Sequence, residues 1–197
     1  MSERYLLPIA ILTIVFILLP ILSRPLAPLN LFVRHLVDSR RNMRFRSLMI
    51  ITHKYNDVLS FSVQLLLLSL VLGLVWQDWR RATILMAAMF VQSTIITLFK
   101  RLTSIDRPPQ IISHVIMTSG SYPSGHSSVS LTFALLAPTV LMPYFGLPII
   151  VVMYVILSLI ALLTAYGRLY LDVHWLTDIL GGWIMSAVIF LLSLSFL

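Results

Sequence analysis

Three short segments of the sequence carry the residue types that phosphate chemistry needs. The first contains Lys100 and Arg107, and the third opens with Arg168. A guanidinium group matches phosphate oxygens two at a time, whereas a lysine ammonium acts as a point charge. If these three cations converge, they predict a binding site for a phosphate group. The segments are Lys100-Arg-Leu-Thr-Ser-Ile-Asp-Arg107-Pro108, Pro123-Ser124-Gly125-His126 and Arg168-Leu-Tyr-Leu-Asp-Val-His174-Trp-Leu-Thr-Asp178.

The second and third segments supply backbone donors, two imidazoles and a carboxylate. Ser124 and Gly125 precede a predicted helix, and free backbone N–H groups at a helix start favour an anion. His174 and Asp178 are four residues apart, so they share a face where they begin a helix. A carboxylate that holds one ring nitrogen leaves the other free as a nucleophile or base. His126 then remains to protonate a leaving alkoxide, which predicts phosphoryl transfer without a metal.

A metal site is the alternative reading of the same acids and histidines. Three cations at one pocket would repel a metal ion, so the sequence favours a site without a metal or other cofactor. The possible metal ligands are His126, His174, Asp172 and Asp178. The remaining histidines are interpreted as ordinary loop or interface residues. They are His35, His53 and His114.

The composition predicts an integral membrane protein. Of the 197 residues, 59% are hydrophobic and 11% are charged, and the mean hydropathy is +0.97. A soluble domain has about 25% charged residues. No second polar stretch is long enough for another domain, which predicts one domain over residues 1–197. The net charge of +7 favours contact with anionic membrane lipids over nucleic acid. Cysteine is absent, which excludes a disulfide and a cysteine nucleophile.

Six apolar stretches approach the roughly 20 residues that a membrane helix needs. They predict an all-α bundle of six transmembrane helices. Because successive spans alternate sides, the three polar segments are expected on one membrane face. The stretches cover about residues 5–23, 58–76, 82–99, 128–142, 148–166 and 176–197.

The stretch 24–57, between the first two predicted spans, is basic. Its apolar residues recur at helical spacing with charged residues between them, a pattern typical of a helix that lies in the membrane interface. A solvated charged loop is the alternative. The apolar residues are Leu29, Phe32, Val33, Leu36 and Val37, and the charged ones are Arg34, Asp38 and Arg41.

Taken together, the three polar segments resemble the signature of the type 2 phosphatidic acid phosphatase superfamily. That signature is Lys-x6-Arg-Pro, then Pro-Ser-Gly-His, then Ser-Arg-x5-His-x3-Asp. All three parts occur here in order, at the same internal spacings, across residues 100–178. One position departs, because Gly167 stands where the family usually has serine. The departure puts that serine's hydrogen bond to the phosphate in doubt rather than the activity.

The resemblance implies a mechanism and a set of roles. His174 would attack phosphorus to give a phosphohistidine, Asp178 would orient it, and His126 would protonate the leaving oxygen. Members of the family work without a metal. The residues implied to hold the phosphate and its developing charge are Lys100, Arg107, Ser124, Gly125 and Arg168.

The expected function is therefore dephosphorylation of a membrane lipid phosphate or diphosphate. Undecaprenyl diphosphate, phosphatidylglycerophosphate, phosphatidic acid and a lipid A phosphate are the candidate substrates. A lipid-linked phosphotransferase is the runner-up, since a phosphohistidine can pass its phosphate to an alcohol. An anion transporter is disfavoured, because the middle spans contain no intramembrane charge pairs.

Two indicators of membrane orientation disagree. Bacterial lipid phosphatases of this family usually place the site on the periplasmic or extracytoplasmic face, and we expect the same here in a bacterial inner membrane. The positive-inside rule favours the opposite, because eleven Lys and Arg residues fall on the site's face and three on the other. Part of this excess lies in the cluster 40–46, which we expect to bind anionic lipid headgroups.

Overall fold

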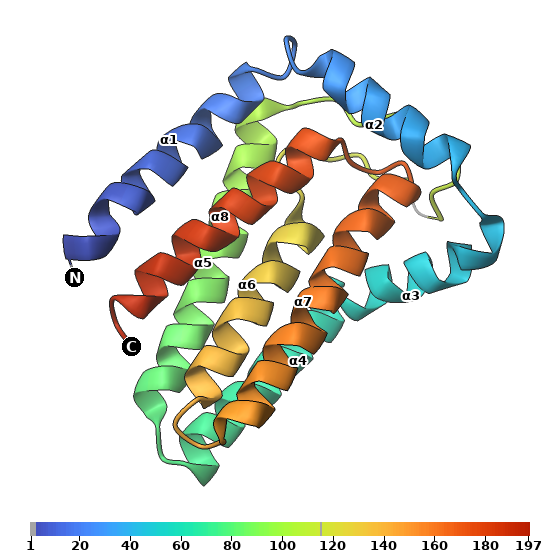
Figure 1. The fold of residues 1–197 in the computed structure, drawn as a ribbon. Coiled ribbons are helices and arrows are strands. Elements are labelled where there is room, and N and C mark those ends of the chain that lie inside the picture. The colour runs from blue at the N-terminus through green and yellow to red at the C-terminus, as the bar shows by residue number, and fades with distance from the viewer. Residues whose placement is uncertain (1–2, 115) are drawn as a thin grey trace.

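All regular structure in the described part of the chain is helical. The computed structural model describes residues 3–114 and 116–197, and these contain no strand, so the all-α class predicted from the sequence is confirmed. Figure 1 shows the arrangement. The helices are α1 (Leu6–Ile21), α2 (Ala27–Ser39), α3 (Arg46–Tyr55), α4 (Val58–Leu70), α5 (Trp79–Thr103), α6 (Gly125–Leu141), α7 (Leu147–Tyr170) and α8 (Leu176–Leu194), with short turns η1 (Glu3–Tyr5), η2 (Met43–Phe45) and the π-helical η3 (Val71–Val75).

Four helical segments of the described residues are long and apolar enough to cross a membrane. They are Glu3–Ile21, α5, α7 and α8. A fifth crossing exists if Met43–Tyr55 and Leu59–Val75, bent by 52°, count as one broken span. Each of the six predicted stretches lies on a helix, but α6 has only 17 residues and falls short of a full span. Helix α6 is short because it begins inside the polar end of the bundle, at Gly125.

Helix α6 is the central element of the bundle. It packs against α7 and α8, while α1 packs against α8 and α4 against α5 (Figure 1). Leu136 and Val140 of α6 are fully buried, as are Leu85 of α5 and Ile150 of α7. By contrast, α1 and α7 each keep an apolar face exposed, as expected for contact with lipid tails.

The basic stretch 24–57 folds into helices α2 and α3 rather than a loop. Helix α2 lies across the end of the bundle, over the ends of α7 and α8 (Figure 1). Its Asn30 exchanges hydrogen bonds with Thr177 of α8, at 3.0 Å and 3.1 Å. Arg41 forms an ion pair of 2.9 Å with the buried carboxylate of Asp172, just before α8. These contacts fix α2 to the segment that joins α7 and α8.

Part of the basic cluster 40–46 therefore has partners inside the chain. Besides Arg41, Arg46 donates to the carbonyl of Ile112 at 3.3 Å. Arg40 and Arg44 are exposed. They are therefore the two residues of this cluster that we still expect to bind lipid headgroups.

At the opposite end of the bundle, Asp78 joins the two turns. Its carboxylate caps α5 by accepting from the Arg81 backbone N–H at 3.0 Å, and it accepts from the Tyr144 hydroxyl at 2.6 Å. The hydrogen bonds from Tyr144 and Arg81 lower the pKa of Asp78 to about 2. Trp76 stacks on Tyr144, with ring centroids 4.3 Å apart. The α4–α5 and α6–α7 turns are thus held together.

Tyr122 links the polar end of the bundle to two transmembrane helices. Its hydroxyl donates to the carbonyl of Phe16 in α1 at 2.6 Å, and its ring lies on Gly181 of α8. A Cβ atom at Gly181 would come within 2.2 Å of that ring. The segment before α6 can therefore approach α8 only because position 181 has no side chain.

We predict that Gly181→Ala lowers the melting temperature of the purified protein in detergent. The Tyr122 ring is buried and tied to Phe16, so it cannot move away, and overpacking of this kind costs about 1–3 kcal/mol. Gly146→Ala is the matched control, because a Cβ there meets only Pro148 at 3.8 Å. Equal melting temperatures for the two variants would contradict the prediction.

Candidate active site

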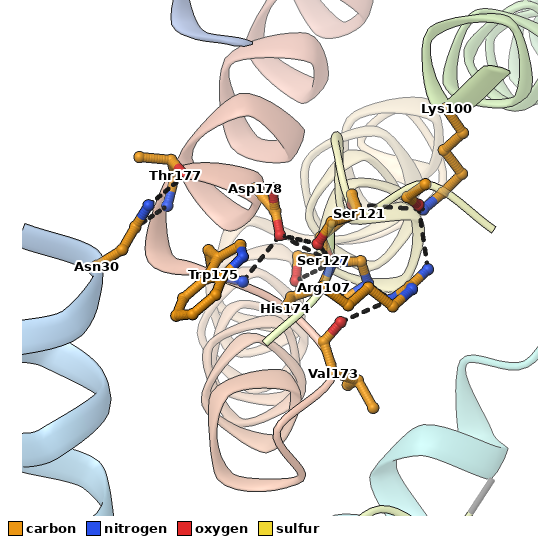
Figure 2. Close-up of polar contacts among 12 residues, drawn as sticks. Asn30, Lys100, Arg107, Ser121, Ser127, Val173, His174, Trp175, Thr177 and Asp178 are labelled. Carbon is orange, nitrogen blue, oxygen red and sulfur yellow. Dashed lines mark hydrogen bonds and ion pairs between the residues drawn. The ribbon is translucent and has the colours of Figure 1, made fainter. Parts of the chain in front are cut away.

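The three predicted polar segments meet at one end of the bundle. The first covers the end of α5 and the loop after it, the second the start of α6, and the third the end of α7 and the start of α8. Figure 2 shows side chains of the first and third segments together with Ser121, which lies just before the second segment. Segments far apart in sequence are thus brought together, as the alternation of spans predicted.

His174 and Asp178 form the pair that their spacing predicted. His174 lies two residues before α8, and its Nδ1 is 3.3 Å from Oδ2 of Asp178 in the first turn of that helix. The same carboxylate oxygen accepts from the backbone N–H of Trp175 at 2.8 Å and from the hydroxyl of Ser121 (Figure 2). Because these donors fix the carboxylate, it holds one edge of the imidazole and leaves Nε2 on the other side.

Arg107 approaches His174 at this second nitrogen. Its Nη1 lies 3.2 Å from Nε2 of His174 and donates to the carbonyl of Val173 at 2.6 Å (Figure 2). Its Nε donates to the carbonyl of Ser119 at 2.9 Å. The guanidinium therefore stands where a phosphate bound at Nε2 would place its oxygens.

Lys100 and Arg107 also hold the loop that precedes α6. Lys100 Nζ donates to the carbonyl of Gly120 at 2.9 Å, and Arg107 Nη2 reaches the same oxygen at 3.2 Å. A Cβ at Gly120 would lie 2.3 Å from the carbonyl oxygen of Lys100, so only glycine fits there. The two cations thereby place Ser121 beside Asp178.

The environment keeps His174 neutral. The residue is 3% exposed, and its pKa lies well below the usual 6.5, first because burial disfavours the charged ring and then because of the charges of Lys100, Arg168 and Arg107. A neutral imidazole has a free lone pair at neutral pH. The site can therefore present a nucleophile without a separate base to deprotonate it.

Arg168 is the most deeply enclosed of the three cations, with 1% exposure. Its Nη1 lies 2.5 Å from Nδ1 of His53 in α3. Its Nε and Nη2 are buried, and neither has a hydrogen-bond partner among the described residues. These two nitrogens form one edge of the guanidinium plane, which is the edge that pairs with two oxygens of a phosphate. This edge has the donors that an anion with two oxygens requires.

At the start of α6, His126 and Gly125 lie as the second segment predicted, whereas Ser124 makes other contacts. His126 lies near these groups, with its Nε2 buried and unpartnered in the described structure, as a proton donor awaiting a substrate would be. Gly125 begins the helix, as predicted. Ser124, however, uses its backbone N–H on the carbonyl of Asp178 at 2.9 Å and its hydroxyl on Ser127 at 2.9 Å. Ser124 therefore positions the helix start against α8.

Two residues at the site were not identified from the sequence. Ser121 has no motif of its own, and only the fold brings it to Asp178. His53 was interpreted as an ordinary histidine, but the structure places it at the site, where it contacts Arg168 and its ring stacks on His126 with centroids 4.5 Å apart. Its spacing of four from Asp57, the same as in His174 and Asp178, was the signal that could have drawn attention to it.

The predicted alternative ligand set does not assemble. Asp172 instead forms ion pairs with Arg34 and Arg41, at 3.7 Å and 2.9 Å. Within the described residues, the side chains that come close enough to share a metal ion are those of His53, Asp57 and His126, whose ligand atoms lie within 4.8 Å of one another. The donation from Arg168 competes with a metal for His53, so this set fits a metal poorly.

Comparison with known proteins identifies the class to which this architecture belongs. Residues 81–197 match the model of the PAP2 superfamily, the type 2 phosphatidic acid phosphatases that the motifs resemble. The match covers more than half of the chain, and the protein is a member of this superfamily.

Individual relatives agree with that assignment. The chain is 35% identical over 95 residues to phosphatidylglycerophosphatase B of Bacillus subtilis (strain 168), an alignment that covers 45% of this chain and 44% of the relative. The fold is similar to the crystal structure of a transmembrane PAP2 type phosphatidylglycerolphosphate phosphatase from Bacillus subtilis, with a TM-score of 0.85, 20% identity and 95% and 94% of the two chains covered. LpxE of Aquifex aeolicus is also similar, with a TM-score of 0.67, 20% identity and 85% and 95% covered.

We predict that the His174 imidazole titrates with its midpoint below the usual 6.5. The folded protein lowers its pKa, first because burial disfavours the charged ring and then because of the nearby cations. ¹⁵N NMR of histidine-labelled protein in micelles measures this, with the His174 signal assigned by its loss in His174→Asn. Arg107→Gln removes one of the charges that lower the pKa and should move the titration to higher pH. A His174 midpoint at or above 6.5 would refute the prediction.

Proposed function

We propose that this protein removes a phosphate group from a membrane lipid phosphate or diphosphate, without a metal. The observation that carries the proposal is the open edge of the buried Arg168, which lies near the charged Lys100 and Arg107 and the neutral His174. A buried guanidinium edge with two unsatisfied donors is costly unless an anion fills it. The motif match to the superfamily and the name of the Bacillus subtilis relative support a phosphate carried by a lipid.

The proposed reaction begins with attack by Nε2 of His174 on phosphorus. Asp178 holds Nδ1, the bond between phosphorus and the leaving oxygen breaks, and His126 donates a proton to that oxygen. Water then attacks the phosphohistidine, with His126 accepting its proton, and inorganic phosphate leaves. Arg107 turns from His174 to the phosphate when the substrate enters. The groups that hold the phosphate are Lys100, Arg107, Arg168, the backbone N–H of Gly125 and the hydroxyl of Ser124, which turns from Ser127 to the phosphate.

We further propose that the chain is one domain with six membrane passes. The bent pair of α3 and α4 makes one pass, and α6 makes another within the protein interior, where α7 and α8 enclose it. Helix α2 would lie in the membrane interface beside the site. Its exposed Leu29, Phe32 and Leu36 support that position, because they are apolar while Asn30 and Val37 face the protein.

The proposed location is a bacterial inner membrane with the site on the extracytoplasmic face. The excess of basic residues on the site's face argues against an extracytoplasmic site, but several of these residues make contacts within the chain. Arg34 and Arg41 pair with Asp172, and Arg46 bonds a carbonyl, so these charges serve the fold. These three residues therefore have a structural reason to lie on this side, apart from any effect on topology.

Orientation can be tested by labelling, because the chain has no natural cysteine. Thr118→Cys places a thiol on the exposed loop at the site, and Gly146→Cys places one on the turn at the opposite end of the bundle. In intact cells, an impermeant maleimide should label the first variant, while the second should react only after permeabilisation. The reverse pattern would refute an extracytoplasmic site.

We predict that the purified protein releases phosphate from at least one lipid in a panel of the four candidate substrates, with chelator present. His174→Ala should lower turnover by at least about 10³-fold, because it removes the nucleophile. His35→Ala, on the exposed face of α2, is the control and should match the wild type. Substantial turnover by His174→Ala, or activity that depends on added metal, would overturn the mechanism.

A further inference from the structure

His53 connects the phosphate-binding part of the site to the proton-donating part. It lies in the last turns of α3, outside residues 81–197 that match the family model. On one side its Nδ1 meets Nη1 of Arg168, and on the other its ring stacks on His126 with an angle of 20° between the planes. Neither contact follows from the family's motifs.

The contact with Arg168 defines what His53 does there. A guanidinium has donors and no acceptor, so Nδ1 of His53 must be the acceptor and its proton must sit on Nε2. His53 thus holds Arg168 through Nη1, the nitrogen outside the open edge. The Nε and Nη2 donors are left free and are aimed by that restraint. Without an acceptor at Nδ1, the guanidinium could rotate, and the phosphate would lose a two-point contact.

The contact with His126 restrains the second imidazole. Two rings 4.5 Å apart and nearly parallel limit each other's rotation. The Nε2 of His126 is buried without a protein partner, so no hydrogen bond at that atom fixes the ring. Stacking on His53 therefore restrains the plane in which His126 offers its proton.

Gly167 explains how α3 reaches the site. A Cβ at this position would lie 3.2 Å from Oγ1 of Thr52 and 3.5 Å from Sδ of Met49, so α3 packs directly on the glycine. Directly after α3, Asn56 donates to Thr164 of α7 at 2.9 Å. The absence of a side chain where the family usually has serine therefore allows the approach that delivers His53 to Arg168.

We propose that His53 is a positioning residue of this site, which aims the guanidinium of Arg168 at the phosphate and the ring of His126 at the leaving oxygen. Helix α3, docked on Gly167, thereby supplies what the serine at that position would have contributed to ordering the phosphate site. The proposal rests on the proposed phosphatase function. It assigns two separable contacts to His53, a hydrogen bond from Arg168 to Nδ1 and the stacking of its ring on His126.

Two substitutions separate these contacts. His53→Phe keeps a ring to stack on His126 but removes the acceptor for Arg168. His53→Asn places an amide oxygen near the position of Nδ1 but removes the ring. His53→Ala removes both, and His35→Ala is the exposed control. Binding of inorganic phosphate reports the Arg168 contact without any turnover, and kcat on phosphatidic acid and on p-nitrophenyl phosphate, with chelator present, reports the His126 contact.

We expect His53→Phe to weaken phosphate binding by about 10-fold or more, the effect of losing a hydrogen bond to a charged group. His53→Asn should bind phosphate within about 3-fold of the wild type. Its kcat should fall at least about 10-fold on phosphatidic acid but less on p-nitrophenyl phosphate, because a good leaving group needs little protonation. Wild-type phosphate affinity in His53→Phe, or equal losses in all three variants that follow their melting temperatures, would overturn the proposal.

Gly167→Ser tests the docking of α3 directly. It restores the family's serine, yet we expect weaker phosphate binding, because the added atoms press on Thr52 and move His53 away from Arg168. Tighter binding would show that the serine acts on phosphate itself and would overturn this role for α3. If the wild type neither binds phosphate nor hydrolyses any lipid, the proposed function fails first, so the two failures are distinguishable.

Discussion

The constraint on which the site depends is the grouping of three cations, of which Arg168 is buried and Lys100 and Arg107 are partly buried. Each carries donors that need acceptors where water is scarce, and Asp178 cannot pair with all of them. The chain satisfies Lys100 and Arg107 with backbone carbonyls of the loop 119–121 and of Val173. Arg168 keeps two donors open. Most of the local structure at this end of the bundle follows from which acceptors these N–H donors bond.

Because its backbone carbonyls accept hydrogen bonds from Lys100 and Arg107, the loop before α6 has a fixed path. Gly120 lets that loop pass against the backbone of Lys100, and Gly181 lets its Tyr122 lie on α8. Ser121 then falls between these points and reaches Asp178. The charges that would receive a phosphate thus also order the loop that supports the His174–Asp178 pair, so binding and catalytic groups share one scaffold. Loss of one cation should therefore disturb the position of the others.

The sequence predicted the parts of this site that depend on the spacing of residues along one helix or motif. The His174–Asp178 pair, the start of α6 at Gly125 and the gathering of three segments at one end follow from helical periodicity and the alternation of spans. The all-α class follows from apolar runs. The contributions of α2 and α3 were not predictable in this way, because Asn30 with Thr177 and His53 with Arg168 are pairs more than a hundred residues apart. Hydropathy did not predict that α6, with 17 residues, is shorter than a full span, because it does not show that this helix begins within a polar site.

Two pairs with the same spacing illustrate why spacing alone does not assign a role. His174 and Asp178 are both buried, and the carboxylate is held by Ser121 and Trp175, so it can orient the ring. His53 and Asp57 are also four apart, but Asp57 is exposed, and Arg168 takes the Nδ1 of His53. Both rings meet a guanidinium at one nitrogen, but the opposite nitrogen of His174 is held by a buried carboxylate, whereas the aspartate four residues from His53 is exposed. The neighbours of each imidazole, rather than its distance from an aspartate, determine which one can be a nucleophile.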